Sequence, residues 1–270
     1  MTEDMADSRI YGLVGHPLGH SFSAHYFKEK FKSMPEKDSV YWNFDFSDLE
    51  KGISQLKSEG RLRGFNVTIP YKKAILAYLD EISEEAAVIG AVNTVVVEPD
   101  TRRWIGCNTD AAGFWNSLQA FMKDRLGEKN LQALVLGNGG ASQAVQYALA
   151  SHGIPYDLVC RPGHGPTEDA PQHFFRPRCI WNYDSLPEKT LKERISLIIN
   201  ATSLGMHPNP NAAPRIPYHA LTASHYAFDL VYNPQETLFL RRCREQGAGI
   251  CGGLGMLYSQ ADAAFSIWMA

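Results

Sequence analysis

The sequence has few of the features that mark a disulfide-stapled or metal-dependent protein. Its five cysteines are an odd number, lie scattered along 270 residues and form no Cys-x-x-Cys pair. Neither a disulfide framework nor a structural zinc site is therefore expected, and a reducing, cytoplasmic location fits best. Of the histidines, only His16 and His20 stand four residues apart, and Pro17 between them argues against a helix that would place both on one metal. We expect no metal, and we interpret both histidines as loop residues.

The chain also lacks a strong charge of either sign and a long apolar run. A formal net charge of −3 leaves no basic footprint of the kind that nucleic-acid-binding proteins carry. Residues 1–9 are polar and acidic, unlike a secretory signal, and no apolar run is long enough to span a bilayer. We therefore expect neither a nucleic-acid partner nor a membrane, and the length allows two modest globular domains.

Short apolar strands alternate with helices along the whole chain, which is typical of an α/β fold with mostly parallel sheets. The pattern predicts strands at 10–15, 39–46, 64–69, 92–97, 133–137, 157–160, 197–200, 226–230 and 249–250. It predicts helices at 23–31, 49–59, 75–87, 112–126, 143–151, 236–246 and 258–269.

The stretch from Gly64 to Asp110 gathers side chains suited to a small polyhydroxylated anion. Lys72 supplies an ammonium group and Asp110 a carboxylate, a pair that could move a proton at one substrate oxygen. Neutral hydrogen-bonding side chains surround them in the sequence, namely Asn66, Thr68, Asn93, Asn108 and Thr109. Taken singly, each has an ordinary structural explanation, such as a helix cap for Asp110. Only their joint occurrence favours a site.

A glycine-rich turn follows the strand predicted at 133–137. It runs GNGGAS from Gly137 to Ser142, with Ser142 at the place of the last glycine in the usual dinucleotide-binding motif. Glycines let the main chain approach a pyrophosphate, and the following helix offers free N–H groups. We predict that the cofactor is bound by Gly137, Asn138, Gly139, Gly140 and Ala141.

Arg161 follows the next predicted strand, where the choice between NAD and NADP is usually made. NAD sites place an acid there for the ribose 2′-OH, whereas arginine accommodates the 2′-phosphate of NADP. Asp157 lies at the wrong end of this strand, and Pro162 offers neither N–H nor hydroxyl to a phosphate. The sequence predicts NADP.

Together these motifs resemble the shikimate dehydrogenase family over nearly the whole chain. The matching segments are 15–23, 64–72, 90–94, 106–110, 200–205, 229–234 and 255–260. The resemblance implies reversible NADPH-dependent reduction of 3-dehydroshikimate to shikimate, in the shikimate pathway of aromatic amino acid biosynthesis, with Lys72 and Asp110 as catalytic residues. The substrate ligands that it implies are Ser21, Ser23, Asn66, Thr68, Asn93, Tyr232 and Gln260. For the cofactor it adds Thr202, Ser203 and Gly253 to the glycine turn and Arg161.

We therefore predict two α/β domains. A substrate-binding domain comprises residues 1–110 and is completed by 253–270, and a Rossmann-type NADP-binding domain comprises 111–252. Two alternatives stay open: an NAD-dependent quinate/shikimate dehydrogenase of the same fold, and a non-catalytic dinucleotide-binding regulator. An acid beside Arg161 would favour the first, and the loss of Lys72 or Asp110 the second; the sequence shows neither change. We expect a monomer or a homodimer.

Overall fold

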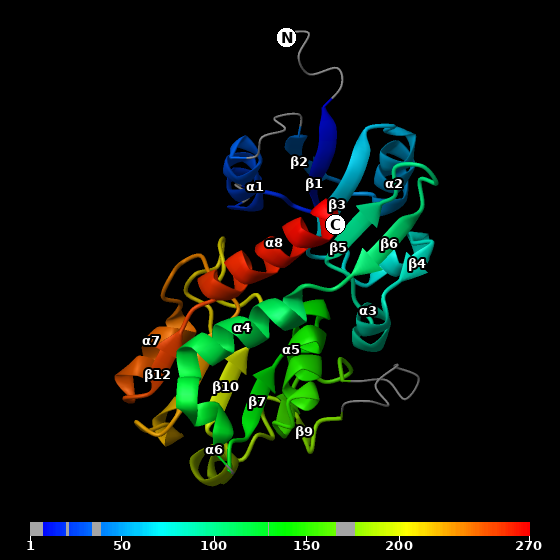
Figure 1. The fold of residues 1–270 in the computed structure, drawn as a ribbon. Coiled ribbons are helices and arrows are strands. Elements are labelled where there is room, and N and C mark those ends of the chain that lie inside the picture. The colour runs from blue at the N-terminus through cyan, green and yellow to red at the C-terminus, as the bar shows by residue number, and fades with distance from the viewer. Residues whose placement is uncertain (1–7, 20–21, 34–38, 129, 166–175) are drawn as a thin grey trace. The chain divides into compact units, whose positions relative to one another are not determined.

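The computed structural model describes residues 8–19, 22–33, 39–128, 130–165 and 176–270. It divides into two compact units, each an α/β structure as predicted (Figure 1). The first unit comprises Met1–Thr109 and Ala263–Ala270, and the second comprises Asp110–Asp262. Within the described part of the chain, every helix falls short of the length and apolarity that a membrane crossing requires.

The first unit holds a six-stranded sheet in the order β2-β1-β3-β5-β6-β4. Its strands are β1 (Arg9–Gly15), β2 (Ser39–Asp45), β3 (Leu62–Val67), β4 (Glu81–Ile82), β5 (Thr94–Val97) and β6 (Trp104–Cys107). Strands β1, β2 and β3 run parallel, whereas β5 is antiparallel to both β3 and β6. The carboxyl ends of β1 and β3 therefore meet at one edge of the sheet, and β5 begins there.

Alternate residues of β1 are buried on opposite faces of this sheet. The helices of the first unit are α1 (Phe22–Lys32), α2 (Leu49–Ser58), η2 (Ala74–Tyr78), α3 (Glu84–Ile89) and the end of α8 (Leu254–Met269). Ile10 and Val14 pack in the core to which α2 contributes. Tyr11, on the other face, packs against Phe31 of α1 and Trp268 of α8, with ring centroids 5.1 and 5.0 Å apart. The end of α8 is thus part of the core of the first unit.

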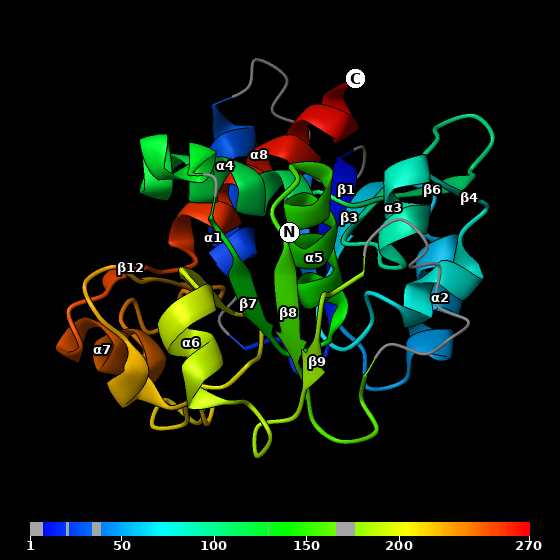
Figure 2. The same cartoon turned by 90° about the horizontal axis from the view of Figure 1, so that it is seen from below.

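The second unit has a parallel sheet in the order β12-β11-β10-β7-β8-β9, the strand order of doubly wound dinucleotide-binding folds. Its strands are β7 (Ala133–Leu136), β8 (Tyr156–Val159), β9 (Ile180–Trp181), β10 (Leu197–Asn200), β11 (Tyr226–Asp229) and β12 (Gly249–Cys251). Figure 2 shows β7, β8 and β9 side by side.

Helices cover both faces of the second sheet, so its four inner strands, β7, β8, β10 and β11, are almost entirely buried. They are α4 (Asp110–Met122), η3 (Lys123–Gly127), α5 (Gly140–Ser151), α6 (Glu188–Arg194), η4 (Tyr218–Ala220), α7 (Leu238–Glu245) and the first part of α8. Ala227 of β11 packs in the core that contains Leu191 of α6 and Phe239 of α7. The next residue, Phe228, points to the other face and packs against Phe114 of α4, with ring centroids 5.2 Å apart.

The helix predicted at 75–87 is wrong. The structure has η2, β4 and α3 there, because Leu79 is extended at the end of η2 and Ser83 caps α3. The Ser83 hydroxyl accepts a hydrogen bond from the Ala86 N–H at 3.3 Å. Gly90 ends α3 with φ +70°, which an L side chain adopts with strain. The short elements β6, β9 and α6 were not predicted from the sequence pattern.

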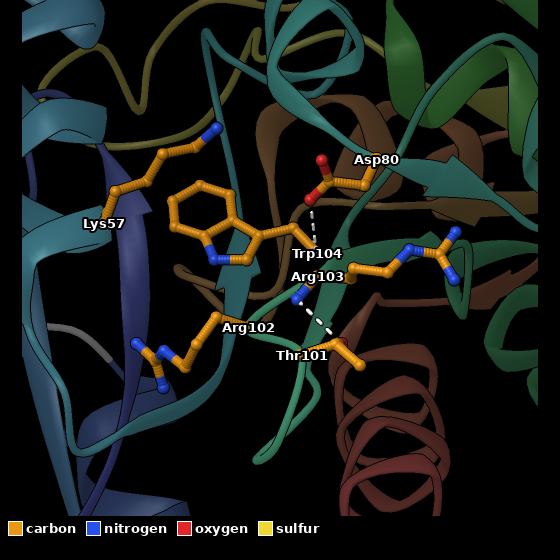
Figure 3. A pocket seen from close by; sticks show the side chains of 6 residues that line it. All are labelled: Lys57, Asp80, Thr101, Arg102, Arg103 and Trp104. Atoms are coloured by element: carbon orange, nitrogen blue, oxygen red, sulfur yellow. Dashed lines mark hydrogen bonds between the residues drawn. The ribbon is translucent and has the colours of Figure 1, made fainter.

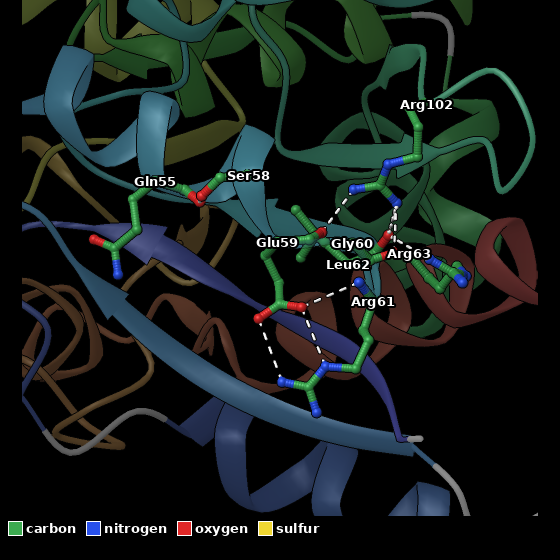
Figure 4. A network of polar contacts seen from close by, with 8 residues as sticks. All are labelled: Gln55, Ser58, Glu59, Gly60, Arg61, Leu62, Arg63 and Arg102. Carbon is green, nitrogen blue, oxygen red and sulfur yellow. Dashed lines mark hydrogen bonds and ion pairs between the residues drawn. The ribbon is translucent and has the colours of Figure 1, made fainter. Parts of the chain in front are cut away.

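Arg102 fastens the tip of the β5–β6 hairpin to the turn that precedes β3. Its guanidinium donates to three main-chain carbonyl oxygens of that turn (Figure 4). They belong to Glu59, Gly60 and Leu62, at N···O distances of 2.7, 3.1 and 2.9 Å. A shallow hollow beside the hairpin tip is lined by Lys57, Asp80, Thr101, Arg102, Arg103 and Trp104 (Figure 3). The hollow lies at the amino end of β3, opposite the edge that carries the polar strand ends.

We expect Arg102→Ala to lower the free energy of unfolding by about 1–2 kcal/mol, because three carbonyl groups lose a charged donor. Arg102 itself has φ +59°, a left-handed conformation in which a side chain is strained. Arg102→Gly loses the same hydrogen bonds but relieves about 1 kcal/mol of that strain, so it should destabilise less. Urea unfolding followed by circular dichroism gives the free energy of unfolding of wild type and of both variants. An alanine variant as stable as wild type would contradict the fastening role.

Candidate active site

Asn66, near the carboxyl end of β3, joins three strands through its buried amide. Its Oδ1 accepts a hydrogen bond from the Tyr41 hydroxyl of β2 at 2.9 Å. Its Nδ2 donates to the Asn93 carbonyl oxygen at 3.3 Å and to Thr94 Oγ1 at 3.2 Å. The antiparallel register of β3 and β5 brings Thr94 opposite Asn66. The amide is therefore held in one orientation at this edge of the sheet.

The buried side chain of Asn93 continues the network toward the end of the first unit. Its Nδ2 donates to Thr109 Oγ1 at 3.0 Å, and its Oδ1 accepts from the Thr109 N–H at 2.8 Å and from Thr94 Oγ1 at 3.1 Å. Asp110 follows Thr109 in the chain, is only 4% exposed and begins α4. A carboxylate in the first turn of a helix is stabilised by the free N–H groups there.

Lys72 and Thr68 follow β3 at the same edge. Thr68 is half-buried, and its N–H donates to the Val14 carbonyl oxygen of β1 at 2.9 Å. Lys72 is half-buried in the turn between β3 and η2, and its carbonyl oxygen accepts from the Val92 N–H at 2.8 Å. Since Val92 precedes Asn93, the structure brings Thr68, Lys72, Asn66 and Asn93 to one end of the first sheet.

Ser23 reaches the same network through Tyr41. It is the second residue of α1, is half-buried and is hydrogen-bonded to the Tyr41 hydroxyl. Burial raises the pKa of Tyr41 well above its ordinary value, and the Ser23 contact opposes that rise. Ser21 and His20 lie outside the described residues. His16 Nδ1 lies 2.6 Å from Asp45 Oδ1, which fits its interpretation as a loop residue.

Tyr41 is a residue that the sequence reasoning missed. Its ring stacks on Phe27, with centroids 4.6 Å apart, as the alternating pattern of β2 would suggest for a packing residue. Only the structure places its hydroxyl between Ser23 and Asn66, two predicted substrate ligands.

The glycine turn of the second unit runs from β7 into α5. Gly137 has φ +99°, and a Cβ there would lie 2.8 Å from Thr202 Cγ2, so glycine lets the turn pack against the end of β10. Gly139 precedes α5 without a side-chain cap, and a Cβ there would meet no atom within 4 Å. The Ser142 hydroxyl donates to the Gly137 carbonyl oxygen, which steadies the turn where the usual motif has its last glycine.

These features fit a pyrophosphate, because the twelve-residue helix α5 starts without a side-chain cap and the space beside Gly139 is open. Gly140 and Ala141 form the first turn of that helix. Asn138 Nδ2 donates to the His164 carbonyl oxygen at 3.1 Å, which joins the turn to the loop after β8. Arg161 lies in this loop with an exposed side chain, available to a phosphate from solvent.

The remaining predicted residues of the second unit lie after β10, β11 and β12 and in α8. Thr202 and Ser203 form the turn after β10. Tyr232, whose pKa is raised by burial, follows β11, and the adjacent Val231 carbonyl oxygen accepts from the Gly253 N–H at 3.1 Å. A Cβ at Gly253 would overlap the Leu230 carbonyl oxygen, so only glycine fits there. The side chain of Gln260, in α8, donates to the Leu257 carbonyl oxygen at 3.0 Å.

Asp229, at the end of β11, is a second residue that the sequence reasoning did not assign. Burial raises the pKa of Asp229 to about 6, although three hydrogen bonds to its carboxylate act in the opposite direction. The groups that face it include the Cys243 thiol of α7 and the Tyr218 phenol of η4; burial raises the pKa of both, and Asp229 adds to the rise. The folded protein therefore holds a proton on Asp229 more tightly than the unfolded chain does.

This raised pKa predicts a stability that falls as the pH rises. The contribution of the protonated group is complete below the unfolded value of 3.8 and is lost as the pH passes through about 6. Relative to Asp229→Asn, which cannot titrate, wild type should lose about 1.4 kcal/mol of unfolding free energy between about pH 5 and about pH 8. Urea unfolding of both proteins at the two pH values checks this. A difference that does not change with pH would contradict an elevated pKa.

Comparison with known proteins gives one consistent match. A family model described as the shikimate dehydrogenase substrate binding domain matches residues 13–95. The shikimate dehydrogenase (NADP(+)) of Caldanaerobacter subterraneus subsp. tengcongensis is 38% identical over 266 residues, which covers 97% of this chain and 91% of that protein.

Solved structures agree with this match. A shikimate dehydrogenase crystallised in complex with NADP+ has a TM-score of 0.82 and 33% identity, over 97% of this chain and 90% of its own. The shikimate 5-dehydrogenase of Thermus thermophilus, in complex with NADP(H) and shikimate, has a TM-score of 0.77 and 34% identity, over 96% of this chain and 93% of its own.

Proposed function

The chain belongs to the shikimate dehydrogenase family, and we propose that it catalyses the reversible NADP-dependent reduction of 3-dehydroshikimate to shikimate. It is thus an oxidoreductase that acts on a CH–OH group. The observation that carries this proposal is the network in the first unit, which orients Asn66 and Asn93 at the sheet edge where Lys72 follows β3. A cytoplasmic location, a monomeric or homodimeric state and a place in aromatic amino acid biosynthesis belong to the same proposal.

The substrate is held by neutral side chains and by the two charged catalytic residues. Hydroxyl groups of Ser21 and Ser23 bind its carboxylate, and Thr68, Asn93, Tyr232 and Gln260 bind its hydroxyls or carboxylate. Asn66 belongs to the same set of ligands, and its amide, which bonds to Tyr41, Asn93 and Thr94, also orients that set.

Lys72 moves the proton of the reaction. During reduction its ammonium group delivers a proton to the carbonyl oxygen of the substrate, and during oxidation its amine takes the proton back. Asp110 accepts a hydrogen bond from a substrate hydroxyl.

Gly137 to Ala141, Thr202, Ser203, Gly253 and Arg161 would hold the cofactor. NADP, when bound, supplies or accepts the hydride that the side chains cannot carry. The uncapped N-terminus of α5 would bind the pyrophosphate, and the exposed Arg161 guanidinium would bind the 2′-phosphate.

A side-by-side assay tests this function against its alternatives. Reduction of NADP+ and of NAD+ is measured with shikimate and with quinate as substrates. The proposal expects turnover of shikimate with NADP+ to exceed the other three combinations. Comparable use of quinate with NAD+ would favour a quinate/shikimate dehydrogenase, and nucleotide binding without turnover would favour a regulator.

Tyr41→Phe should raise KM for shikimate about three- to tenfold with a smaller effect on kcat. The substitution removes one hydroxyl, so the Asn66 amide and Ser23 lose a common partner, whereas the stacking on Phe27 remains. Steady-state kinetics with saturating NADP+ gives both constants. Tyr78→Phe, in η2 of the same unit, is the matched control. An unchanged KM in Tyr41→Phe would show that the network does not act on the substrate.

A further inference from the structure

Asp229 is a fully buried carboxylate at the carboxyl end of β11. Its Oδ1 accepts hydrogen bonds from Asn200 Nδ2 and from the Val231 N–H, both at 2.9 Å. Its Oδ2 accepts from the Thr237 hydroxyl at 2.5 Å. All three donors are neutral, and burying a carboxylate among neutral groups is unfavourable compared with burying an amide of the same shape. This side chain therefore needs an explanation other than stability.

Asn200, at the end of β10, connects Asp229 to the turn that follows this strand. Its Oδ1 accepts from the Thr202 N–H at 3.1 Å and from Thr202 Oγ1 at 2.6 Å. Its Nδ2, besides donating to Asp229, donates to the Leu204 carbonyl oxygen at 3.3 Å. The amide thus binds both ends of the turn that contains Thr202 and Ser203.

An ionised carboxylate accepts hydrogen bonds and donates none, so Asp229 determines which way this amide faces. The NH2 group of Asn200 must therefore face Asp229, and the amide oxygen Oδ1 then faces Thr202. With the amide reversed, the NH2 group would meet the Thr202 N–H, and two donors would face each other. Asp229 therefore selects the orientation that closes the turn.

The same carboxylate reaches the other ligand-bearing segments of the second unit. Through the Val231 N–H it holds the main chain immediately before Tyr232. The Val231 carbonyl oxygen in turn accepts from the Gly253 N–H at 3.1 Å. One buried side chain thus connects the segments after β10, β11 and β12.

We propose that Asp229 is a positioning residue that, through Asn200, holds the Thr202–Leu204 turn in the conformation that binds NADP. This inference rests on the proposed function, since it concerns the cofactor of the same reaction. It assigns Asp229 and Asn200 no contact with substrate or cofactor. Their effect is on the shape of the turn that makes such contacts.

The test is the affinity for NADP+ without substrate, measured by titration of intrinsic protein fluorescence or by calorimetry. Asp229→Ala and Asn200→Ala should each raise the Kd for NADP+ about tenfold, and the double variant should be no worse than either alone, because both act through one turn. Asp229→Asn keeps an acceptor oxygen but can also turn its NH2 group toward Asn200, so its Kd should lie between those of wild type and Asp229→Ala. The kcat/KM for NADP+ should fall most in the variants whose Kd rises most.

Thr237→Val is the matched control, because it removes the partner of the other carboxylate oxygen. It also removes the cap of α7, since Thr237 Oγ1 accepts from the Leu240 N–H. It should lower the melting temperature while leaving the Kd for NADP+ unchanged. A Kd in Thr237→Val that rises as much as in Asp229→Ala would mean that Asp229 only supports the fold.

Two further outcomes would overturn the inference. Wild-type affinity for NADP+ in Asp229→Ala is one of them. The other is an unchanged Kd for NADP+ in Asn200→Ala. This second variant decides alone if Asp229→Ala does not fold. A wild-type protein that fails to bind NADP+ would instead contradict the proposed function, so the two failures are distinguishable.

Discussion

Replacing Lys72 by alanine is expected to lower kcat for shikimate oxidation by at least about 100-fold, while the Kd for shikimate changes by less than about tenfold. The reason is that the ammonium group acts on the oxygen that gains or loses a proton in the transition state. The neutral side chains of the first unit still hold the ground state. Steady-state kinetics with NADP+ gives kcat, and equilibrium titration with shikimate gives the Kd.

Lys73→Ala is the control for this experiment. It removes the same charge from the next residue, whose side chain is exposed at the start of η2, and should leave kcat within about twofold of wild type. Near-normal kcat in Lys72→Ala would show that the proton travels by another route. A loss of similar size in both variants would point to the net charge of the segment.

Wild type is expected to prefer NADP+ over NAD+ by at least about tenfold in kcat/KM, or about 1.4 kcal/mol. Arg161→Ala is expected to remove most of this preference. The exposed guanidinium after β8 can form paired hydrogen bonds with a 2′-phosphate. The pyrrolidine of Pro162 adds no donor, so the preference depends on Arg161. Kinetics with NAD+ should be nearly unaffected, because NAD+ has no phosphate to lose.

The control for the cofactor experiment is Arg241→Ala, which removes an exposed arginine from α7 of the same unit. It should leave both cofactors unaffected. An equal loss with NADP+ and NAD+ in Arg161→Ala would mean that this arginine supports the loop or the adenine instead of the phosphate. A wild-type preference for NAD+ would favour the quinate/shikimate alternative.

Much of the fold could be predicted because its strands are short, apolar and separated by helices. The strand predicted at 197–200 matches β10, and the glycine turn lies between β7 and α5 as expected. The prediction failed at 75–87, where an apolar helical pattern continued through a position that the structure keeps extended. Ser83 caps the start of α3 and Gly90 ends it, and an apolar pattern does not show either end.

Site residues could be predicted from the sequence only where the residue type itself indicates a chemical role. Lys72, Asp110 and Arg161 carry charges at informative places in the sequence. Tyr41 and Asp229 do not, because a tyrosine in an alternating strand is usually a packing residue and an acid at the end of a strand has many ordinary uses. Their roles depend on hydrogen bonds between strands that are distant in the sequence, such as Tyr41 to Asn66 and Asp229 to Asn200.

This chain should interconvert shikimate and 3-dehydroshikimate with NADP. The most direct test incubates the purified protein with shikimate and NADP+ and then, separately, with 3-dehydroshikimate and NADPH, and measures both carbon compounds by NMR and the nucleotide by absorbance. We predict one 3-dehydroshikimate formed for each NADPH formed, and the reverse in the second mixture. NADPH formed or consumed without the matching change in shikimate, or no turnover in either direction, would contradict it.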